Sequence, residues 1–496
     1  MTNIVLIHPR LFRSECHFCP LPLNLLSISS ILDKEGYKIK IIDQRINSDW
    51  KRELIKELKN EPTCVGITSM VGAQILGGLT TSKIVKENSD APVVWGGPFP
   101  TMLPQLTIEN ENVDVVCEGE GEITFYELVK TLEKSKPLSE VKGIWYKENE
   151  KIRRNEKRPF LDLNNLPDLP YHLINLKDYK REFGSWITKE FMISVLTSRG
   201  CPYQCTYCFN QIVNQCRWRA LRSERVIELL KNLVDKYHVK YFRFNDDNFF
   251  VSQKRANEIM RGILREKMDI KMEFQGTRVD TICRMKKNEL NVLYDAGCRS
   301  FSIGLETGSP RILKLIKKGT TIEQAYAANK RLSRYPEIRS QYNFMAGFPT
   351  ETINDLSMTV NMMSKLYKEN PNIKIPILFL FTPWPGTDIY NLTIQHGFAP
   401  PKSLMGWGYM DWNDEIPRNI VARPWLSNEF KKMFSNVTMI NYLADSIDIE
   451  LHSNIFKILA KLYLPFAKFR FNHNFYNFVP EGVLIGLIWK ISQSGY

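Results

Sequence analysis

Short runs of β-branched and other apolar residues alternate with amphipathic stretches over the first 150 residues of this 496-residue chain. This alternation predicts a parallel sheet that helices cover on both faces. The strands are expected at residues 4–8, 38–43, 63–68, 92–95 and 113–117. Ligands of such sheets bind at the carboxyl ends of the strands, so the residues that follow these runs are candidates for a site.

A second series of alternating runs begins near residue 191. Its strands are expected at residues 192–196, 241–245, 271–276, 300–304, 340–346 and 373–381. Six βα units predict an open, partial (β/α)6 barrel of the TIM type, with active residues at the carboxyl ends of the strands. Beyond residue 400 the alternation ends, and helices are expected at residues 427–443 and 455–464.

The predicted fold class is therefore α/β, and four regions follow from the pattern. They are a Rossmann-like domain at residues 1–147, a linker at 148–190, the barrel at 191–399 and a helical region at 400–496. The linker is rich in Lys, Asn, Pro and Asp and has no clear periodicity, which is typical of a segment without a core of its own.

Polar residues and glycines stand where the predicted strands end. In the first domain these are Ser69, Gly96, Gly97, Glu118, Gly119 and Glu120. In the barrel they are Asp246, Asp247, Arg278, Glu306 and Gly347. Glycines let the backbone approach a bulky ligand, although tight turns explain them equally well. The two aspartates could simply cap the next helix, and Arg278 and Glu306 could form a structural salt bridge with each other.

Composition narrows the functional classes. With 67 basic and 54 acidic residues the net charge is +13, which favours an acidic partner without choosing between lipid, nucleic acid and a phosphorylated metabolite. No apolar run approaches the roughly 20 residues that span a bilayer. Ten cysteines are too sparse for a disulfide scaffold, and residues 1–8 resemble a first strand more than a signal peptide. A reducing cytoplasm is the expected location.

Three cysteines dominate the chemistry of the chain. Cys201, Cys205 and Cys208 directly follow the predicted strand at residues 192–196, and thiolate is the ligand that iron-sulfur clusters and zinc prefer. A closed zinc site normally has four protein ligands, whereas a cluster held by three thiolates keeps one iron open. A zinc site with a distant fourth ligand, or buried cysteines without metal, are the alternatives.

The spacing Cys-x3-Cys-x-aromatic-Cys, with Tyr207 before the last cysteine, resembles the radical S-adenosylmethionine (radical SAM) family. The resemblance implies that the three cysteines hold a 4Fe-4S cluster, that SAM binds the open iron, and that an electron splits SAM to a 5′-deoxyadenosyl radical. It also implies that Tyr207 and Phe209 border the adenine and that Gly347 leaves room for it. Asp246, Asp247, Arg278 and Glu306 would then bind the methionine and ribose groups of SAM.

The N-terminal domain resembles the cobalamin-binding domain that precedes this core in one large subfamily. The likeness rests on residues 22–26, the Gly96-Gly97 turn and the Gly119-Glu120-Gly121-Glu122 run. It implies that the candidate residues of the first domain contact cobalamin, namely Ser69, Gly96, Gly97, Glu118, Gly119 and Glu120. The Asp-x-His-x-x-Gly motif that ligates cobalt from below is absent. The lower axial position is then empty, or held by water or a non-histidine group, or else the domain has lost the cofactor.

The resemblance implies methylation of an unactivated carbon, with cobalamin passing on a methyl group from a second SAM. A radical cyclase or rearrangement enzyme, which transfers no methyl group, is the alternative. Methylthiotransferases hold a second cluster with three N-terminal cysteines, for which Cys16, Cys64 and Cys117 are available here. A cluster protein that binds RNA or a membrane without turnover is a further alternative. Cys16 and Cys19 form half a metal site, for which an ordinary loop or a redox-active edge is the simpler interpretation.

The expected partners are a small-molecule or lipid-like substrate and an electron donor such as flavodoxin or ferredoxin, and nucleic acid is not expected. The predicted helix at residues 455–464 carries Lys457 and Lys461 beside several apolar residues. It is either a cap on the barrel or a basic, aromatic-rich helix that makes a peripheral contact with a membrane.

Overall fold

The structure is a computed structural model, and it describes residues 3–10, 19–179, 191–370, 372–410, 423–444, 454–476 and 479. The chain divides into two compact units. The first consists of Met1–Gly200, Phe209–Phe242 and Pro400–Trp412. The second consists of Cys201–Cys208, Arg243–Ala399 and Asn413–Tyr496.

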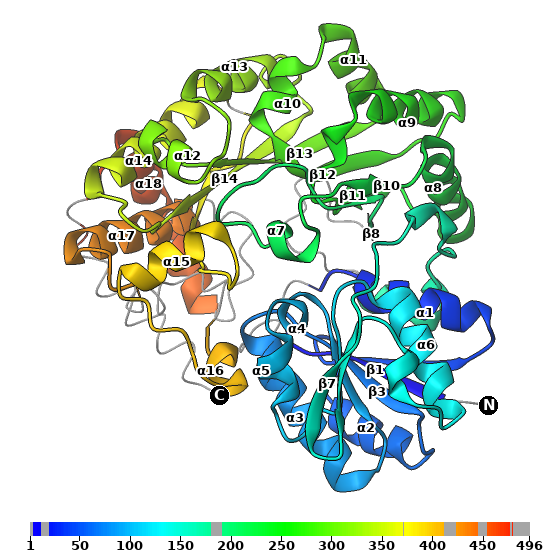
Figure 1. Ribbon diagram of the computed structural model, residues 1–496. Helices are drawn as coiled ribbons and strands as arrows, with labels where there is room; N and C mark the ends of the chain where they lie inside the picture. The colour runs from blue at the N-terminus through cyan, green and yellow to red at the C-terminus, as the bar shows by residue number, and fades with distance from the viewer. Residues whose placement is uncertain are drawn as a thin grey trace. The chain divides into compact units, whose positions relative to one another are not determined.

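A seven-stranded sheet with the order β2-β1-β3-β4-β5-β6-β7 forms the centre of the first unit (Figure 1). Its strands are β1 (Asn3–His8), β2 (Lys38–Asp43), β3 (Cys64–Thr68), β4 (Val93–Gly96), β5 (Val115–Cys117), β6 (Ile144–Glu148) and β7 (Lys151–Arg154). The first five strands pair in parallel, which confirms the five predicted from the sequence. β2 lies on one side of β1, and the next strand along the chain, β3, lies on its other side. The strand order therefore reverses at a switch point between β1 and β3.

Helices cover both faces of this sheet. Helix α1 (Leu23–Lys34) packs against α6 (Gly121–Glu133), and α2 (Trp50–Leu58) packs against α3 (Ala73–Asn88) (Figure 1). As a result, Ile4, Val5, Leu6 and Ile7 of β1 are all fully buried. A strand covered on both faces has no polar alternation, which explains why these runs are continuously apolar in the sequence.

The sheet extends further along the chain than the hydrophobic pattern indicates. Lys151–Arg154, which the sequence analysis assigned to the linker, forms β7 and pairs antiparallel with β6. All four of its side chains are exposed, so it has no buried face to reveal it as a strand. Instead Arg154 stacks its guanidinium 4.9 Å from the centre of the Trp145 ring on the neighbouring strand.

The second sheet has six strands in the order β15-β14-β13-β12-β11-β8 and curls as part of a barrel (Figure 1). Its strands are β8 (Met192–Val195), β11 (Tyr241–Phe244), β12 (Lys271–Arg278), β13 (Cys298–Glu306), β14 (Arg339–Ala346) and β15 (Ile377–Leu380). These are the six predicted strands, so the α/β fold class is confirmed. The last strand starts at Ile377 instead of residue 373, because Ile373 forms only an isolated bridge with Ser340.

Helices follow the strands of this sheet in the second unit. They are α9 (Gln253–Arg265), α11 (Lys287–Asp295), α13 (Ile322–Leu332) and α14 (Ile353–Glu369). Thr321 and Thr352 begin α13 and α14 with capping boxes, each satisfying free backbone N–H groups of the first turn. Phe249 and Phe250 pack against Phe274 with tilted rings at centroid distances of 4.8 and 5.1 Å, so this aromatic pair belongs to the core.

The chain beyond residue 400 contributes to both units. Helices α17 (Asn428–Ala444) and α18 (Asn454–His473) pack against each other, as expected for a helical region. In contrast, α16 (Leu404–Gly408) belongs to the first unit and packs on α3, where the Gly72 N–H donates to the Trp407 carbonyl at 3.2 Å. Among the helices of the described residues, none is both long and apolar enough to cross a membrane.

Candidate active site

The three-cysteine loop lies directly after β9 (Ser198–Arg199). Gly200 has φ +81°, and a Cβ there would lie 2.0 Å from the Arg217 carbonyl oxygen, so only glycine fits this turn. Within the second unit, the Thr206 N–H donates to the Ile316 carbonyl and the Thr206 carbonyl accepts from Ile389, both at 3.0 Å. Backbone contacts on both sides therefore hold the segment between Cys205 and Cys208 in place.

Side-chain donors face two of the sulfur atoms of this loop. Asn248 Nδ2 donates to Cys201 Sγ at 3.7 Å, and Arg278 Nη1 approaches Cys205 Sγ at 4.0 Å. Asn248 and Arg278 favour the thiolate of Cys201, which is the form that binds metal, although burial is the larger effect and raises the pKa of Cys201 overall. No three His, Cys, Asp or Glu side chains of the described ranges gather closely enough to hold one metal ion. A cluster has no such requirement, because its three thiolates bind three different irons, and the residues present fit that arrangement.

Arg278 is the buried centre of a second group of contacts. It comes at the end of β12, and its guanidinium lies 3.6 Å from the centre of the Tyr203 ring. Its Nε donates to Asp280 Oδ1 at 2.9 Å and its Nη2 donates to the Lys318 carbonyl at 2.7 Å. The salt bridge between Arg278 and Glu306 that the sequence left open does not form, because Asp280 and the Lys318 backbone already bind the guanidinium.

Glu306 instead pairs with Lys318, a residue that the sequence analysis did not single out. Lys318 Nζ lies 2.6 Å from Glu306 Oε1, and both side chains are more than nine-tenths buried. A Cβ at Gly304 would come within 2.6 Å of that carboxylate oxygen, so the glycine makes room for the pair. Burial is the largest single effect on Lys318 and would lower its pKa, but the Glu306 carboxylate and Cys205 together outweigh it and the pKa is raised.

Tyr207 connects this pair to an aromatic contact. Its hydroxyl lies 3.5 Å from Lys318 Nζ, and its ring meets the Phe348 ring edge-on at 5.8 Å. Burial, followed by the Glu306 carboxylate, raises the pKa of Tyr207 well above its ordinary value. The structure thus brings Tyr207, Arg278 and Glu306 into one region of the second unit. Phe209 precedes α7 (Asn210–Val213) in the first unit, and its place beside the adenine stays a prediction.

The two predicted aspartates follow β11 on the same edge of the sheet. Asp246 is buried and interacts electrostatically with Arg255 of α9, whereas Asp247 is exposed. Gly276 of β12 has φ +61°, and a Cβ there would lie within 2.3 Å of the Asp247 carbonyl. This close approach joins the end of β11 to β12. Neither side chain caps a helix, since Ser252 caps α9.

Gly347 ends β14 in a turn that a buried carboxyl group organises. The N–H groups of Gly347 and Phe348 donate to Glu351 Oε2 at 2.6 and 2.9 Å. Trp425 Nε1 donates to the Gly347 carbonyl at 2.9 Å. Burial raises the pKa of Glu351 to about 8, and these two donated hydrogen bonds only partly offset it. The sequence Gly347-Phe348-Pro349 indicates the turn, but nothing local indicates that Glu351 supports it.

Glu351→Gln is expected to remove a pH dependence of stability. The ordinary pKa is 4.5 and the folded value is about 8, so between these values the folded chain holds a proton that the unfolded chain has released. Stability contributed by this group therefore falls as the pH rises through that window. Calorimetry at pH 8.5 should show the variant more stable than the parent by on the order of 2 kcal/mol, with no difference near pH 5. Glu369→Gln, at a half-exposed position of α14, is the control, and equal pH profiles for all three proteins would contradict the assignment.

In the first unit, the predicted strand ends meet at one edge of the sheet. The Ser69 N–H donates to the Gly96 carbonyl at 2.9 Å, and the Phe99 N–H donates to the Ser69 carbonyl at 3.1 Å. Gly97 has φ +102°, and a Cβ there would lie 2.9 Å from the Ser69 carbonyl. At Gly119, with φ +93°, a Cβ would meet nothing within 4 Å. A tightly packed backbone edge with open space at Gly119 fits a bulky ligand such as cobalamin.

Glu118 and Glu120 are held by cations of the chain itself. Glu118 Oε1 lies 2.6 Å from Lys157 Nζ, and Glu120 Oε1 lies 2.9 Å from Arg199 Nη1. Arg199 also binds the buried Glu122, whose Oε1 accepts from Nη2 at 2.5 Å. This network ties the end of β5 to the strand that precedes the cysteine loop. A cofactor-binding role for Glu118 and Glu120 stays a prediction, and the ion pairs give both residues a structural role.

Two of the three cysteines considered for a second cluster, Cys64 and Cys117, lie among the described residues. Cys64 and Cys117 lie in the hydrophobic core of the first unit. Burial raises the pKa of Cys117 to about 12 and that of Cys64 further still, which favours the thiol form in the absence of a metal. Cys19 is buried near the Arg45 carbonyl, and Cys16 lies outside the described residues. Because Cys16 is not among those residues, the methylthiotransferase cluster stays an alternative from the sequence.

Two family models match the chain in the regions that the fold defines. Residues 195–363 match the radical SAM superfamily, and residues 10–129 match the B12-binding domain. An uncharacterized methyltransferase of Pyrococcus horikoshii is 34% identical over 436 residues, which cover 86% of this chain and 89% of that protein. The anaerobic magnesium-protoporphyrin IX monomethyl ester cyclase of Synechocystis is 25% identical over 75% of this chain and 73% of its own.

Among solved structures, the radical SAM methyltransferase TsrM from Kitasatospora setae, with cobalamin and a 4Fe-4S cluster bound, has the same fold. It superposes with a TM-score of 0.67 at 17% identity, over 89% of this chain and 96% of that chain. The chain belongs to the radical SAM enzymes that carry an N-terminal B12-binding domain. The predicted cofactors, a 4Fe-4S cluster, SAM and cobalamin, are those of this family.

Proposed function

We propose that this enzyme transfers a methyl group to an unactivated carbon of a small organic substrate. The observation that carries the proposal is the likeness to the Pyrococcus methyltransferase, which extends over both the B12-binding domain and the barrel. When bound, the cluster supplies the electron that cleaves SAM, and cobalamin carries the methyl group. Cys201, Cys205 and Cys208 are the proposed cluster ligands.

The residues around the cysteine loop have separate tasks in this proposal. In this proposal Glu306, paired with Lys318, and Arg278, paired with Asp280, offer both signs of charge to the zwitterionic methionine group of SAM. Tyr207 and Phe348 offer an aromatic wall for the adenine. The burial of Arg278, Glu306 and Phe348 excludes water from their surroundings, which strengthens each electrostatic contact and protects a reactive radical.

The partners are also part of the proposal. The net charge of +13 favours an acidic electron-transfer protein such as a flavodoxin or ferredoxin as donor. A hydrophobic or lipid-like substrate is consistent with the aromatic residues near the cysteine loop. Cytoplasmic location stays a prediction from the cysteine usage.

A radical cyclisation without methyl transfer is the second candidate, and the Synechocystis cyclase favours it. The two reactions differ in what becomes of SAM. Methyl transfer consumes one SAM as a methyl donor, which releases S-adenosylhomocysteine, in addition to the SAM that is cleaved to methionine and 5′-deoxyadenosine. Cyclisation releases no S-adenosylhomocysteine.

The test is an anaerobic reconstitution with iron, sulfide, cobalamin, a low-potential reductant and SAM labelled with deuterium in its methyl group. Methyl transfer predicts that S-adenosylhomocysteine forms and that its formation requires cobalamin. 5′-Deoxyadenosine without S-adenosylhomocysteine would favour the cyclase, as would a protein that never retains cobalamin. An intact cluster that fails to bind SAM, measured by electron paramagnetic resonance, would exclude both reactions.

A further inference from the structure

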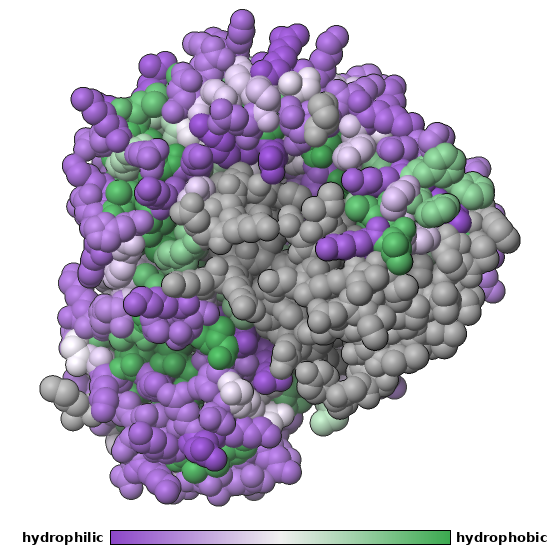
Figure 2. Space-filling model, turned by 180° about the vertical axis from the view of Figure 1, so that it is seen from behind, coloured by the Kyte–Doolittle hydropathy of each residue, from purple (hydrophilic) through white to green (hydrophobic). Residues whose placement is uncertain are grey.

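One face of helix α18 exposes a row of large apolar side chains. Leu462 is 68% exposed, Phe466 66% and Phe469 54%. These residues are spaced by four and three positions, so they lie on the same side of the helix. Figure 2, a half-turn from Figure 1, shows hydrophobic side chains at the right edge, the side to which the rotation carries α18. Three such residues in one row are unusual on a protein surface that only water covers.

The orientation of the helix is fixed by its opposite face. Ala467 and Phe471 are buried, and the Phe471 ring meets Tyr367 of α14 edge-on at 5.2 Å. Asn474, just beyond the helix, donates from Nδ2 to Asn361 Oδ1 at 2.7 Å. The exposed row therefore points away from the unit because the helix is anchored, and a rotation that buried the row would break these contacts.

The charge of α18 has only one sign. None of its 20 residues is acidic, and it carries Lys457, Lys461, Lys468 and Arg470. Lys461 and Lys468 lie on the outer half of the helix beside the apolar row. No carboxylate within the described ranges forms an ion pair with either lysine. A surface that combines apolar side chains with lysines is complementary to an anionic bilayer.

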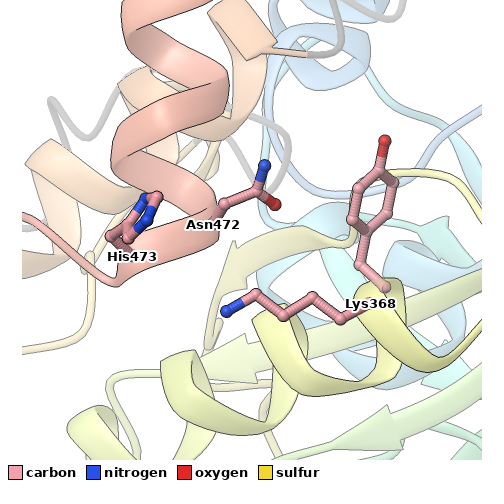
Figure 3. A pocket seen from close by; sticks show the side chains of 4 residues that line it. Lys368, Asn472 and His473 are labelled. Carbon is pink, nitrogen blue, oxygen red and sulfur yellow. The ribbon is translucent and has the colours of Figure 1, made fainter.

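A pocket with polar lining residues lies at the end of the helix. Tyr367 and Lys368 of α14 line it together with Asn472 and His473 of α18, and its volume is about 440 Å³. Figure 3 shows the Lys368 side chain extending from α14 toward the side on which Asn472 and His473 lie. His473 is one helical turn beyond Phe469, with the ring centroids 4.2 Å apart, so the pocket continues the apolar row.

We propose that α18 and this pocket dock on the surface of a bilayer that contains anionic phospholipids. Leu462, Phe466 and Phe469 enter the interface between headgroups and acyl chains, while Lys461 and Lys468 meet the negative surface. Lys368, Asn472 and His473 bind a phosphate headgroup. The proposal is independent of the reaction catalysed, since none of these residues belongs to the candidate active site.

The test is flotation of the full-length protein with vesicles of phosphatidylcholine alone and of phosphatidylcholine with phosphatidylglycerol. Binding is expected only to the second kind and should weaken as the salt concentration rises. Phe466→Ser combined with Phe469→Ser should lower the partition coefficient about 100-fold. Leu264→Ser, at an exposed apolar position of α9, is the matched control and should bind like the parent. Thermal melting of each variant shows that the fold is intact.

Separate variants test the contribution of the lysines to membrane binding. Lys368→Gln and Lys461→Gln should each weaken binding to the anionic vesicles by about fivefold. Lys254→Gln, whose side chain on α9 is 89% exposed, is the control for a general loss of charge. Glycerol phosphate that competed fully with the vesicles would assign the pocket to a free phosphate and overturn the membrane docking.

Two other outcomes would also overturn the proposal. Equal binding to both kinds of vesicle, or to neither, would exclude an anionic bilayer. If the parent protein is dimeric in sedimentation and Phe466→Ser with Phe469→Ser makes it monomeric, the row belongs to an interface between two copies of the chain.

Discussion

Cys205→Ala is expected to abolish the iron-sulfur cluster while the chain remains folded. Cys205 is the most deeply buried cysteine of the loop, and Arg278 Nη1 approaches its sulfur. Loss of one of three thiolates leaves an iron without a protein ligand, and alanine creates only a small cavity. The brown absorbance near 400 nm should disappear, and iron should fall from about four per chain to below about one. Cleavage of SAM should drop by about 10³-fold or more.

The matched control is Cys283→Ala, because Cys283 is also partly buried in the second unit but lies on α10 (Val279–Arg284). This variant should keep the full absorbance and iron content. Circular dichroism of both variants should equal that of the parent. A Cys205→Ala protein that retains the complete spectrum would remove Cys205 from the ligand set.

The strands of both sheets could be predicted because their signal is local. In β1 a continuous run of apolar residues indicates a strand that is buried on both faces, and the residues that indicate it are neighbours in the sequence. Strand β7 was missed because Lys151–Arg154 is exposed on every side chain, and its place in the sheet comes from pairing with β6. The packing of Trp407 on the first unit was missed for a related reason, since its partner Phe99 is over 300 residues away in the chain.

The candidate site could be predicted as a set of positions but not as a set of partners. The ends of parallel strands share one edge, and this rule alone located Arg278, Glu306 and Gly347. The rule does not predict which charged side chains form ion pairs with each other, because the pairing depends on the register between strands. In the structure Arg278 of β12 is paired with Gly304 of β13. Between Gly304 and Glu306, the register of β13 against β14 shifts. That offset turns Glu306 toward Lys318 and leaves Arg278 to Asp280.

The same limit applies to acidic residues that resemble ligands for a cofactor. Glu118, Glu120 and Glu122 follow β5 in a run that matches a cofactor-binding motif, but Lys157 and Arg199 come to them from distant parts of the sequence. Periodicity and motif spacing contain no information on such partners. A buried carboxylate is costly in free energy unless a cation or several hydrogen-bond donors pair with it, and this holds whichever ligand binds nearby.

Lys318→Met is expected to cost about 3–5 kcal/mol of unfolding free energy, because it leaves the buried Glu306 carboxylate without its cation. Lys317→Met is the control one residue away. Lys317 is 61% exposed and pairs with Asp388 at 3.3 Å, so its loss should cost less than about 1 kcal/mol. Denaturant unfolding of both variants measures the difference. Equal stabilities would show that the pair contributes nothing to the fold.

Combining Lys318→Met with Glu306→Gln separates stability from SAM binding. The double variant has no buried charge to leave unpaired, so it should recover more than half of the stability lost in Lys318→Met. If Glu306 also binds the ammonium group of SAM, the recovered protein should still bind SAM at least about tenfold more weakly than the parent, as titrated by the change in the cluster spectrum. Recovery of both properties together would make the pair purely structural. Because glycine at position 304 leaves space beside β13, a carboxylate and an ammonium group come together there, and the methionine part of SAM carries the same two kinds of group.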